Sequence, residues 1–174
     1  ALAPRTLRRR RARCSAADVE FQNSGEAGLS RLLQHHFRSP DYHLMNHITI
    51  PIGDGTTQID HILVSRFGVF VIETKDYKGW IFGQLDQRQW TQVLYKRKFR
   101  FQNPIIQNRR HVQAVADLLD FLPAHHISSI VVFVGEAELK TEVPPFVLHA
   151  TDVVDFIRKQ SIEVMTSDRL ALCV

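Results

Sequence analysis

Cysteine and long apolar runs are both scarce in this sequence. Its 174 residues include two cysteines, Cys14 and Cys173, near opposite ends of the chain. Without a Cys-x-x-Cys pair or a dense cysteine framework, a zinc ribbon and a disulfide scaffold are excluded, as suits a reducing cytosol. No apolar run approaches the roughly 20 residues that a membrane-spanning helix needs. We therefore expect a cytoplasmic protein with no membrane span in this chain.

The composition also lacks the signs of a disordered or multidomain chain. Hydrophobic residues make up 44% and charged residues 23% of the sequence, which is an ordinary globular mix able to bury a core. A chain of this length has room for one domain, because single cores take roughly 100 to 200 residues. We expect one folded domain over residues 21–174 and a separate arm over residues 1–20.

The arm has no counterbalancing acids. Residues 5–13 hold six arginines, and the whole chain without them has 16 basic against 18 acidic side chains, so nucleic-acid binding cannot be inferred from overall basicity. Such a run forms a solvated, disordered arm, binds phosphates or flanks a membrane segment on its cytoplasmic side. The start at Ala1-Leu2-Ala3 without Met suggests a missing upstream piece. An apolar anchor there would place the protein on the cytoplasmic face of a membrane.

The rest of the chain mixes helical and strand patterns. Apolar spacing predicts a helix over residues 26–37, a second from Asn103-Pro104 to Pro123, and a third from Thr151 to Lys159. Strands are predicted over residues 43–51, 58–65, 69–75, 80–85, 89–95, 98–101, 129–135 and 146–150. Several of these strands are apolar on both faces, as expected inside a sheet covered by helices. The order predicts an α/β fold with a mixed central β-sheet flanked by helices.

Three charged residues interrupt two of the most apolar strands. If the connecting turn is centred on residues 66–67, Asp60 lies opposite Glu73. Opposed side chains share one face about 5 Å apart, and Lys75 joins them because strand side chains repeat every two residues. A bulge at Gly68 would shift the pairing by one residue and send Glu73 to the other face.

This cluster predicts a metal-assisted reaction at phosphorus. Two carboxylates crowded together in an apolar surrounding resist joint ionisation, so a cation is needed to neutralise them. Mg²⁺ takes one or two protein carboxylates and keeps waters and phosphate oxygens, and it lowers the pKa of bound water. Lys75 would orient that water or offset charge in the transition state. The alternative is a structural ion pair, or charges that reach solvent at a strand end.

Several motifs then follow one another in a fixed order. They are Gly25-Glu26, Gln58-Ile59-Asp60-His61, GVFVIETK at 68–75, Trp90, and FQNPIIQ at 101–107. Together they resemble the nuclease-related domain (NERD) family of the PD-(D/E)XK superfamily, over roughly residues 24–122. The resemblance implies a restriction-endonuclease-like core and metal-dependent cleavage of nucleic acid phosphodiesters. Ile59 stands where the superfamily name has proline, a departure that family members commonly show.

The resemblance assigns roles to the charged residues of the cluster. On the superfamily pattern, Asp60 and Glu73 would ligate Mg²⁺ or Mn²⁺, and the Thr74 carbonyl would help to hold the ion. Lys75 would serve the attacking water. The domain over residues 21–174 would then be a single NERD-like nuclease domain.

Two further residues belong to the expected catalytic set. A first-helix acid often reaches the metal in this superfamily, but Glu26 fits a capping box with Asn23 equally well, and both interpretations stay open. Gln107 resembles the extra glutamine of Mrr-like restriction endonucleases, although His111 replaces the usual tyrosine four residues on. An ordinary surface or boundary side chain is an equally good interpretation of Gln107 and the stronger one for His111. His61 alternates away from Asp60, so we expect a packing or hydrogen-bonding role for it.

The expected partner is nucleic acid, DNA before RNA, and the resemblance is compatible with a homodimer. Cations at residues 96–100 alternate with aromatic residues and would either contact phosphates or remain solvated. Trp80 and Trp90 are expected to pack in the core or on the hairpin in preference to serving as stacking platforms. A rival interpretation keeps the fold but drops turnover, leaving a nucleic-acid-binding or partner-docking module.

Overall fold

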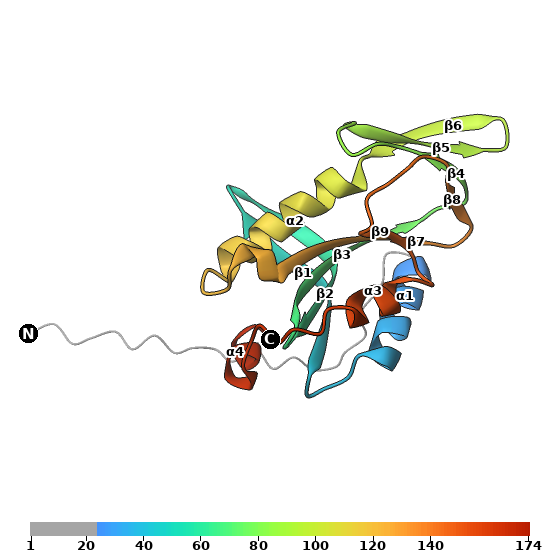
Figure 1. The fold of residues 1–174 in the computed structure, drawn as a ribbon. Coiled ribbons are helices and arrows are strands. Elements are labelled where there is room, and N and C mark those ends of the chain that lie inside the picture. The colour runs from blue at the N-terminus through green and yellow to red at the C-terminus, as the bar shows by residue number, and fades with distance from the viewer. Residues whose placement is uncertain (1–23) are drawn as a thin grey trace, which may run out of the picture.

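A computed structural model describes residues 24–174 (Figure 1), so the arginine arm and the Asn23 cap lie outside the described residues. The helices are α1 (Ser24–His36), α2 (Pro104–Leu118), α3 (Val153–Arg158) and α4 (Ser167–Leu172), with a short 3-10 helix η1 (Ala124–His126). The strands are β1 (Tyr42–Ile52), β2 (Gly55–Ser65), β3 (Gly68–Asp76), β4 (Gly79–Phe82), β5 (Gln89–Leu94), β6 (Arg97–Gln102), β7 (Ile127–Val134), β8 (Ala137–Leu139) and β9 (Val147–His149). Within residues 24–174, no helix is long and apolar enough to cross a membrane.

Five strands form the central sheet in the order β1-β2-β3-β7-β9. The first three strands pair antiparallel, whereas β7 runs parallel to β3 and β9 parallel to β7. Every residue of β3 from Gly68 to Thr74 is buried, because helices cover both faces of the sheet. The predicted α/β fold with a mixed central sheet is confirmed, and it is consistent with a restriction-endonuclease-like core.

Two apolar layers sandwich this sheet. Figure 1 shows α2 on one side of the sheet and α1 with α3 on the other. The layer beneath α2 contains Ile62, Val64, Val69, Val71, Ala114 and Val115. The layer beneath α1 and α3 contains Leu29, Leu33, Leu63, Phe70, Ile72, Val153 and Ile157. The β2 and β3 residues alternate between the two layers, as the two-residue repeat of strands requires.

The hairpin between β2 and β3 has the predicted register. Ser65 pairs with Gly68 and His61 with Ile72, so the turn is centred on residues 66–67 and has no bulge. Gly68 has φ of +137°, and a Cβ there would lie 2.9 Å from the carbonyl oxygen of His126. Glycine is therefore needed both for the backbone conformation and for the close approach of the η1 segment.

A second sheet, in the order β6-β5-β4-β8, stands apart from the central one. The strands β5 and β6 of this sheet lie close to the predicted segments 89–95 and 98–101, whereas the three-residue strand β8 was not predicted. One face of the second sheet packs on β7. There the ring of Trp90, which is fully buried, stacks on Phe133 with centroids 6.2 Å apart and ring planes 1° apart.

Some helix ends also differ from prediction. The helix α2 ends at Leu118 instead of Pro123, although Leu119 and Leu122 still pack into the core from the following turn. Asp152, and not Thr151, is the residue before α3. Burial of apolar residues beyond a helix end gives the same spacing as a longer helix, so periodicity alone misplaced the first boundary.

One polar residue ties α2 to the central sheet. Asn108 is fully buried, and its amide group donates to the Val71 carbonyl at 2.9 Å, the Ile130 carbonyl at 3.0 Å and the Ser129 hydroxyl at 2.8 Å. Two of these acceptors are backbone carbonyls of the adjacent strands β3 and β7. Removing the amide would leave buried acceptors without donors, which is more costly than losing a solvated hydrogen bond.

We expect Asn108→Ala to lower the free energy of unfolding by about 2–3 kcal/mol, because it leaves a small cavity and unpaired carbonyls. Urea denaturation followed by circular dichroism measures this change. Gln113→Ala is the matched control, since that amide lies on the same helix and bonds to exposed Asp117. Equal stability of the two variants would contradict the assigned role of Asn108.

Candidate active site

The candidate site lies where β2 and β3 separate. Their backbone ladder ends at His61–Ile72, while β3 remains paired with β7 as far as Asp76. Two residues beyond Ile72 on β3, the backbone N–H of Thr74 donates to Oδ2 of Asp60 at 2.8 Å. A side-chain carboxylate thus binds a backbone donor of β3 just beyond the end of the ladder. This opens the edge of the sheet beside two carboxylates.

The side-chain alternation of β1 and β2 also breaks at this level. Two pairs of residues three positions apart pack against the same core beneath α2: Met45 with Ile48, and Ile59 with Ile62. Regular strands place residues three apart on opposite faces, so both strands switch faces in between, at His47 and Asp60. His47 has φ of +52°, a conformation that residues other than glycine seldom adopt. Asp60 therefore stands at a local twist of the sheet.

A hollow of about 340 Å³ lies at this opening. It contains every residue that the sequence placed in the catalytic set, contributed by α1, β2, β3 and α2. The residues that line it are Glu26, Gln58, Asp60, Glu73, Thr74, Lys75, Asp76, Tyr77 and Gln107. Residues up to 81 positions apart in the chain are thus brought together in one place.

Glu73 is held by Lys75 and lies against His111. Its Oε1 accepts a hydrogen bond from Lys75 Nζ at 2.7 Å, and Lys75 also donates to Gln107 Oε1 at 3.1 Å. Its Oε2 lies 3.2 Å from His111 Nε2, but the two groups are not aligned for a hydrogen bond. Burial favours a raised pKa for Glu73, yet His111 and Lys75 outweigh burial and lower that pKa. Glu73 is therefore ionised at neutral pH.

Asp60 has the opposite electrostatic surrounding. Burial raises the pKa of Asp60 to about 7, and the negative charge of Glu73 adds to the rise. The Thr74 N–H and, less strongly, Lys75 act against it. The two acids therefore differ in protonation near neutral pH, because the positive charge present is sufficient for only one of them.

This donor set fits a hard divalent cation. The buried Oε2 of Glu73 has no aligned hydrogen-bond donor among the described residues, and Asp60 lacks a compensating charge. Over residues 24–174, no three His, Cys, Asp or Glu side chains are grouped closely enough to hold a metal by themselves. A cation here would rely on two carboxylates, a backbone oxygen and waters, which is the coordination that Mg²⁺ accepts.

Glu26 reaches the hollow from the first turn of α1. It is buried, and its Oε2 lies 3.0 Å from Nε2 of His47. Its charge also contributes to the raised pKa of Asp60. Of the two interpretations left open by the sequence, the one involving Asn23 lies outside the described residues, whereas the contacts of Glu26 described here belong to the site.

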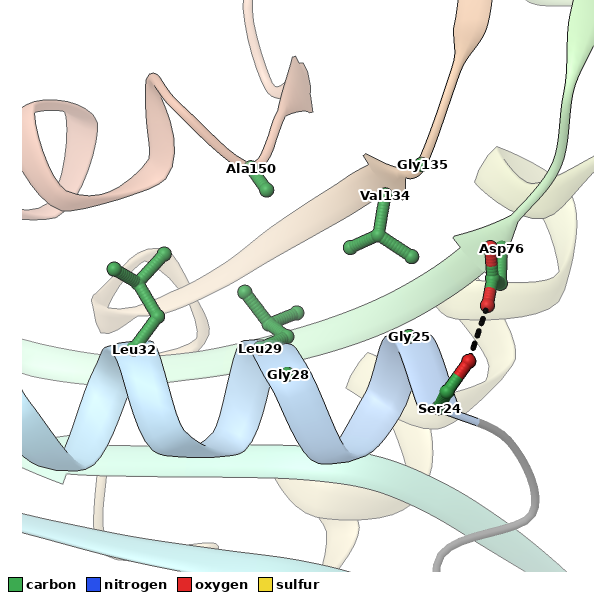
Figure 2. Close-up of a pocket in the computed structure, with 9 residues that line it drawn as sticks. All are labelled: Ser24, Gly25, Gly28, Leu29, Leu32, Asp76, Val134, Gly135 and Ala150. Carbon is green, nitrogen blue, oxygen red and sulfur yellow. Dashed lines mark hydrogen bonds between the residues drawn. The ribbon is translucent and has the colours of Figure 1, made fainter.

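A glycine lets α1 come this close. A Cβ on Gly25 would lie 2.4 Å from Cγ2 of Val134 and 2.7 Å from Oδ2 of Asp76, so any side chain would push the helix away. Figure 2 shows Gly25 facing the ends of β3 and β7, and the hydroxyl of Ser24 donating to Asp76 at 3.4 Å. The Gly25-Glu26 motif therefore combines close packing with delivery of the acid.

Two histidines of the site carry more contacts than the sequence suggested. His47 was not singled out, although its position on β1 is level with Asp60 in the pairing register. His111, favoured as a boundary residue, is buried beside Glu73 and shares a hydrogen bond of 3.0 Å with the Thr57 hydroxyl through Nδ1. In the sequence, the spacing of four residues from Gln107 was the feature that could have indicated that His111 lies at the site.

His61 lies outside the hollow, in a polar cluster on the α1 side. Its Nδ1 is 2.7 Å from Oδ1 of Asn46, which also accepts from the Ser30 hydroxyl at 3.3 Å. Burial lowers the pKa of His61 to about 4, so the imidazole is neutral at physiological pH. These contacts fit the structural hydrogen-bonding role expected for it.

The amino-acid sequence is similar to those of known proteins. An uncharacterized protein of Bacillus anthracis is 40% identical over 99 residues, which are 56% of this chain and 46% of that protein. The matched region thus spans less than half the length of that relative. The nuclease-related domain family matches residues 22–134, well over half of the chain and every residue that lines the hollow. The chain belongs to the nuclease-related domain (NERD) family.

Proposed function

We propose that this protein is a metal-dependent nuclease that hydrolyses phosphodiester bonds in nucleic acid, with DNA as the expected substrate. The observation that carries the proposal is the convergence of Asp60, Glu73 and Lys75 in one hollow at the opening between β2 and β3. Membership of a nuclease-related family supports it. Two acids and a lysine at the edge of a sheet provide what hydrolysis at phosphorus requires: a cation site and a donor near it.

Asp60, Glu73 and the Thr74 carbonyl would hold Mg²⁺ or Mn²⁺. When bound, such an ion supplies positive charge that lowers the pKa of water and stabilises negative charge on phosphate oxygens. Two observations support this assignment: Oε2 of Glu73 has no aligned hydrogen-bond donor among the described residues, and the raised pKa of Asp60 indicates missing positive charge there.

Lys75 would act on the attacking water. Its ammonium group has three donors, two of which bond to Glu73 and Gln107. The third can donate to a water or to a phosphate oxygen, where it would orient the nucleophile or offset developing charge. Gln107 serves as a positioning residue in this scheme, because it fixes the lysine from the α2 side.

Glu26 and the two histidines would support the acids. Glu26 adds negative charge beside Asp60 and so strengthens the attraction for a cation, while His47 holds its carboxylate at 3.0 Å. His111 lies against Glu73 from the opposite side and is itself anchored on Thr57. These contacts fix the direction of each carboxylate before a substrate binds, which favours catalysis by preorganised charges.

We expect Glu73→Gln and Lys75→Met each to reduce the rate of Mg²⁺-dependent cleavage by about 10²- to 10⁴-fold, because each removes charge needed in the transition state. Cleavage is followed with fluorescently labelled single-stranded DNA, double-stranded DNA and RNA. Binding of the same substrates, measured with Ca²⁺ in place of Mg²⁺, should persist in both variants.

Asp117→Asn is the control for this series, since that carboxylate is exposed on α2 and bonds only to Gln113 among the contacts described. Wild-type rates in both Glu73→Gln and Lys75→Met would refute the catalytic assignment. Binding without cleavage of any substrate by the wild-type protein would favour the rival interpretation, a binding module on the same fold.

The raised pKa of Asp60 gives a prediction for stability without metal. Between about pH 4 and pH 7 the folded protein keeps a proton that the unfolded chain has released, so its stability falls as the pH rises through this window. In EDTA, we expect the free energy of unfolding to fall between pH 5 and pH 8 by about 1–3 kcal/mol more in the wild-type protein than in Asp60→Asn. Urea denaturation at both pH values measures the difference.

Metal binding should reverse this loss. Mg²⁺ at pH 8 should stabilise the wild-type protein but not Asp60→Asn, because only the ionised carboxylate attracts the ion. At pH 6, calorimetry in two buffers of different ionisation enthalpy should detect protons released as Mg²⁺ binds. The absence of proton release, together with equal Mg²⁺ stabilisation of both proteins, would place the ion elsewhere.

A further inference from the structure

The second sheet exposes aromatic side chains on the face turned away from the core. On β4, Ile81 is fully buried, whereas its neighbours Trp80 and Phe82 are 49% and 37% exposed. Both therefore project from the same outward face, about 7 Å apart along the strand. Of the two tryptophans, Trp90 packs in the core as expected, whereas the ring of Trp80 is half exposed on the second sheet. Two large apolar rings side by side on a surface are a typical feature of a binding site.

Cations stand beside these rings on the same face. The pairing of β4 with β5 and of β5 with β6 sets two rows across the sheet: Trp80, Val93 and Lys98, and next to it Phe82, Thr91 and Arg100. Directly opposed residues of antiparallel strands share a face. The outer face, as we call these six residues, thus carries aromatic rings on β4 and cations on the edge strand β6, roughly 10 Å away.

The stretch of sequence that contains β5 and β6 is strongly one-sided in charge, although Glu136 and Glu138 line a hollow beside Trp80 and Val93. Residues 87–116 include no Asp or Glu but hold seven cations: Arg88, Lys96, Arg97, Lys98, Arg100, Arg109 and Arg110. Apart from the arginine arm, the rest of the chain has more acids than bases. The acid that the register places opposite Trp80 is Glu138, which is paired with Lys140. The Nζ of Lys140 lies 5.1 Å from the ring centroid of Trp80 and so adds a further cation.

The outer face is also close to the hollow along the chain. Tyr77 lines the hollow, and its ring packs on Phe101 of β6 with centroids 4.6 Å apart. Trp80 follows Lys75 by five residues, so their Cα atoms are at most about 17 Å apart. A strand of a few nucleotides could therefore contact both places.

We infer that the outer face binds single-stranded nucleic acid, with Trp80 and Phe82 stacking on unpaired bases and Lys98 and Arg100 contacting phosphates. The rings of bases in a duplex already stack on one another, so exposed aromatic side chains select strands whose bases are free. The concentrated positive charge matches a phosphate backbone. This inference rests on the proposed function for its partner, and it narrows the substrate class to nucleic acid with an unpaired segment.

Binding in EDTA tests the inference without cleavage. Fluorescence anisotropy of a labelled oligothymidylate of about 15 nucleotides, compared with a duplex of equal length, measures both affinities for the full chain. We expect tighter binding of the single strand, weakened about 5- to 100-fold in Trp80→Ala and largely retained in Trp80→Phe. The matched control is Phe121→Ala, whose ring is 38% exposed in the turn after α2. The arginine arm is present in every variant and contributes equally.

Two further readouts separate stacking from charge. Binding should quench the fluorescence of Trp80, and this quenching should vanish in Trp80→Phe while buried Trp90 still emits. In the double variant Lys98→Gln and Arg100→Gln, the slope of log affinity against log salt should fall by about 1.4, from about 0.7 for each lost phosphate contact on a single strand. Lys159→Gln, an exposed cation after α3, should leave the slope unchanged.

Unchanged single-strand affinity in both Trp80→Ala and the double charge variant would overturn the inference, and would assign the outer face to a protein partner. If Trp80→Ala unfolds, the double charge variant and the quenching still decide the outcome. Single-strand binding that depends on these residues, in a protein that cleaves nothing, would uphold the inference and refute the proposed function. Cleavage with no dependence on these residues would do the reverse.

Discussion

The site depends on one hydrogen bond, from the Thr74 backbone N–H to the carboxylate of Asp60. An uninterrupted ladder between β2 and β3 would direct such donors to backbone carbonyls and keep the strand ends together. Here β3 stays in the sheet beyond Ile72 through its pairing with β7, while the part of β2 before His61 is not paired with it. The opening leaves a hollow beside side chains that would otherwise be enclosed. The carboxylate also gains a donor that partly offsets its burial.

The electrostatics of the site follow from which elements surround each acid. Glu73 faces α2, which supplies His111 and, through Gln107, fixes the position of Lys75. Asp60 stands on the other side of the opening, where α1 brings a second acid, Glu26, instead of a cation. One carboxylate is thus ionised by its protein neighbours and the other remains short of positive charge. A divalent cation between them would supply the missing charge, so the asymmetry is what makes the site attractive to metal.

The sequence predicted the parts of this arrangement that depend on local spacing. A two-residue turn fixes the register of a hairpin, so the β2–β3 ladder followed from residues 66–67 alone, and the ordered motifs placed the hollow's acids and lysine. The contacts of His47 and His111 could not be predicted from the sequence. They depend on the change of face in β1 and β2 and on how α2 packs against the sheet. The strand β8, which completes the second sheet beside β4, was not predicted either, because its three residues carry too little pattern.

The two sheets differ in a way that suits different tasks. In the central sheet, strand β3 is apolar on both faces and buried up to Thr74, so that sheet positions the residues of the hollow at its edge but offers no broad surface. In the second sheet, Gly83 leaves room for Trp90, whose ring carbons would lie within 2.2 Å of a Cβ there. With Trp90 filling the inner face, the alternation of β4 and β5 leaves the opposite face to solvent. A broad exposed face near the hollow, of the kind needed to bind an extended polymer, is therefore available from the second sheet and not from the first.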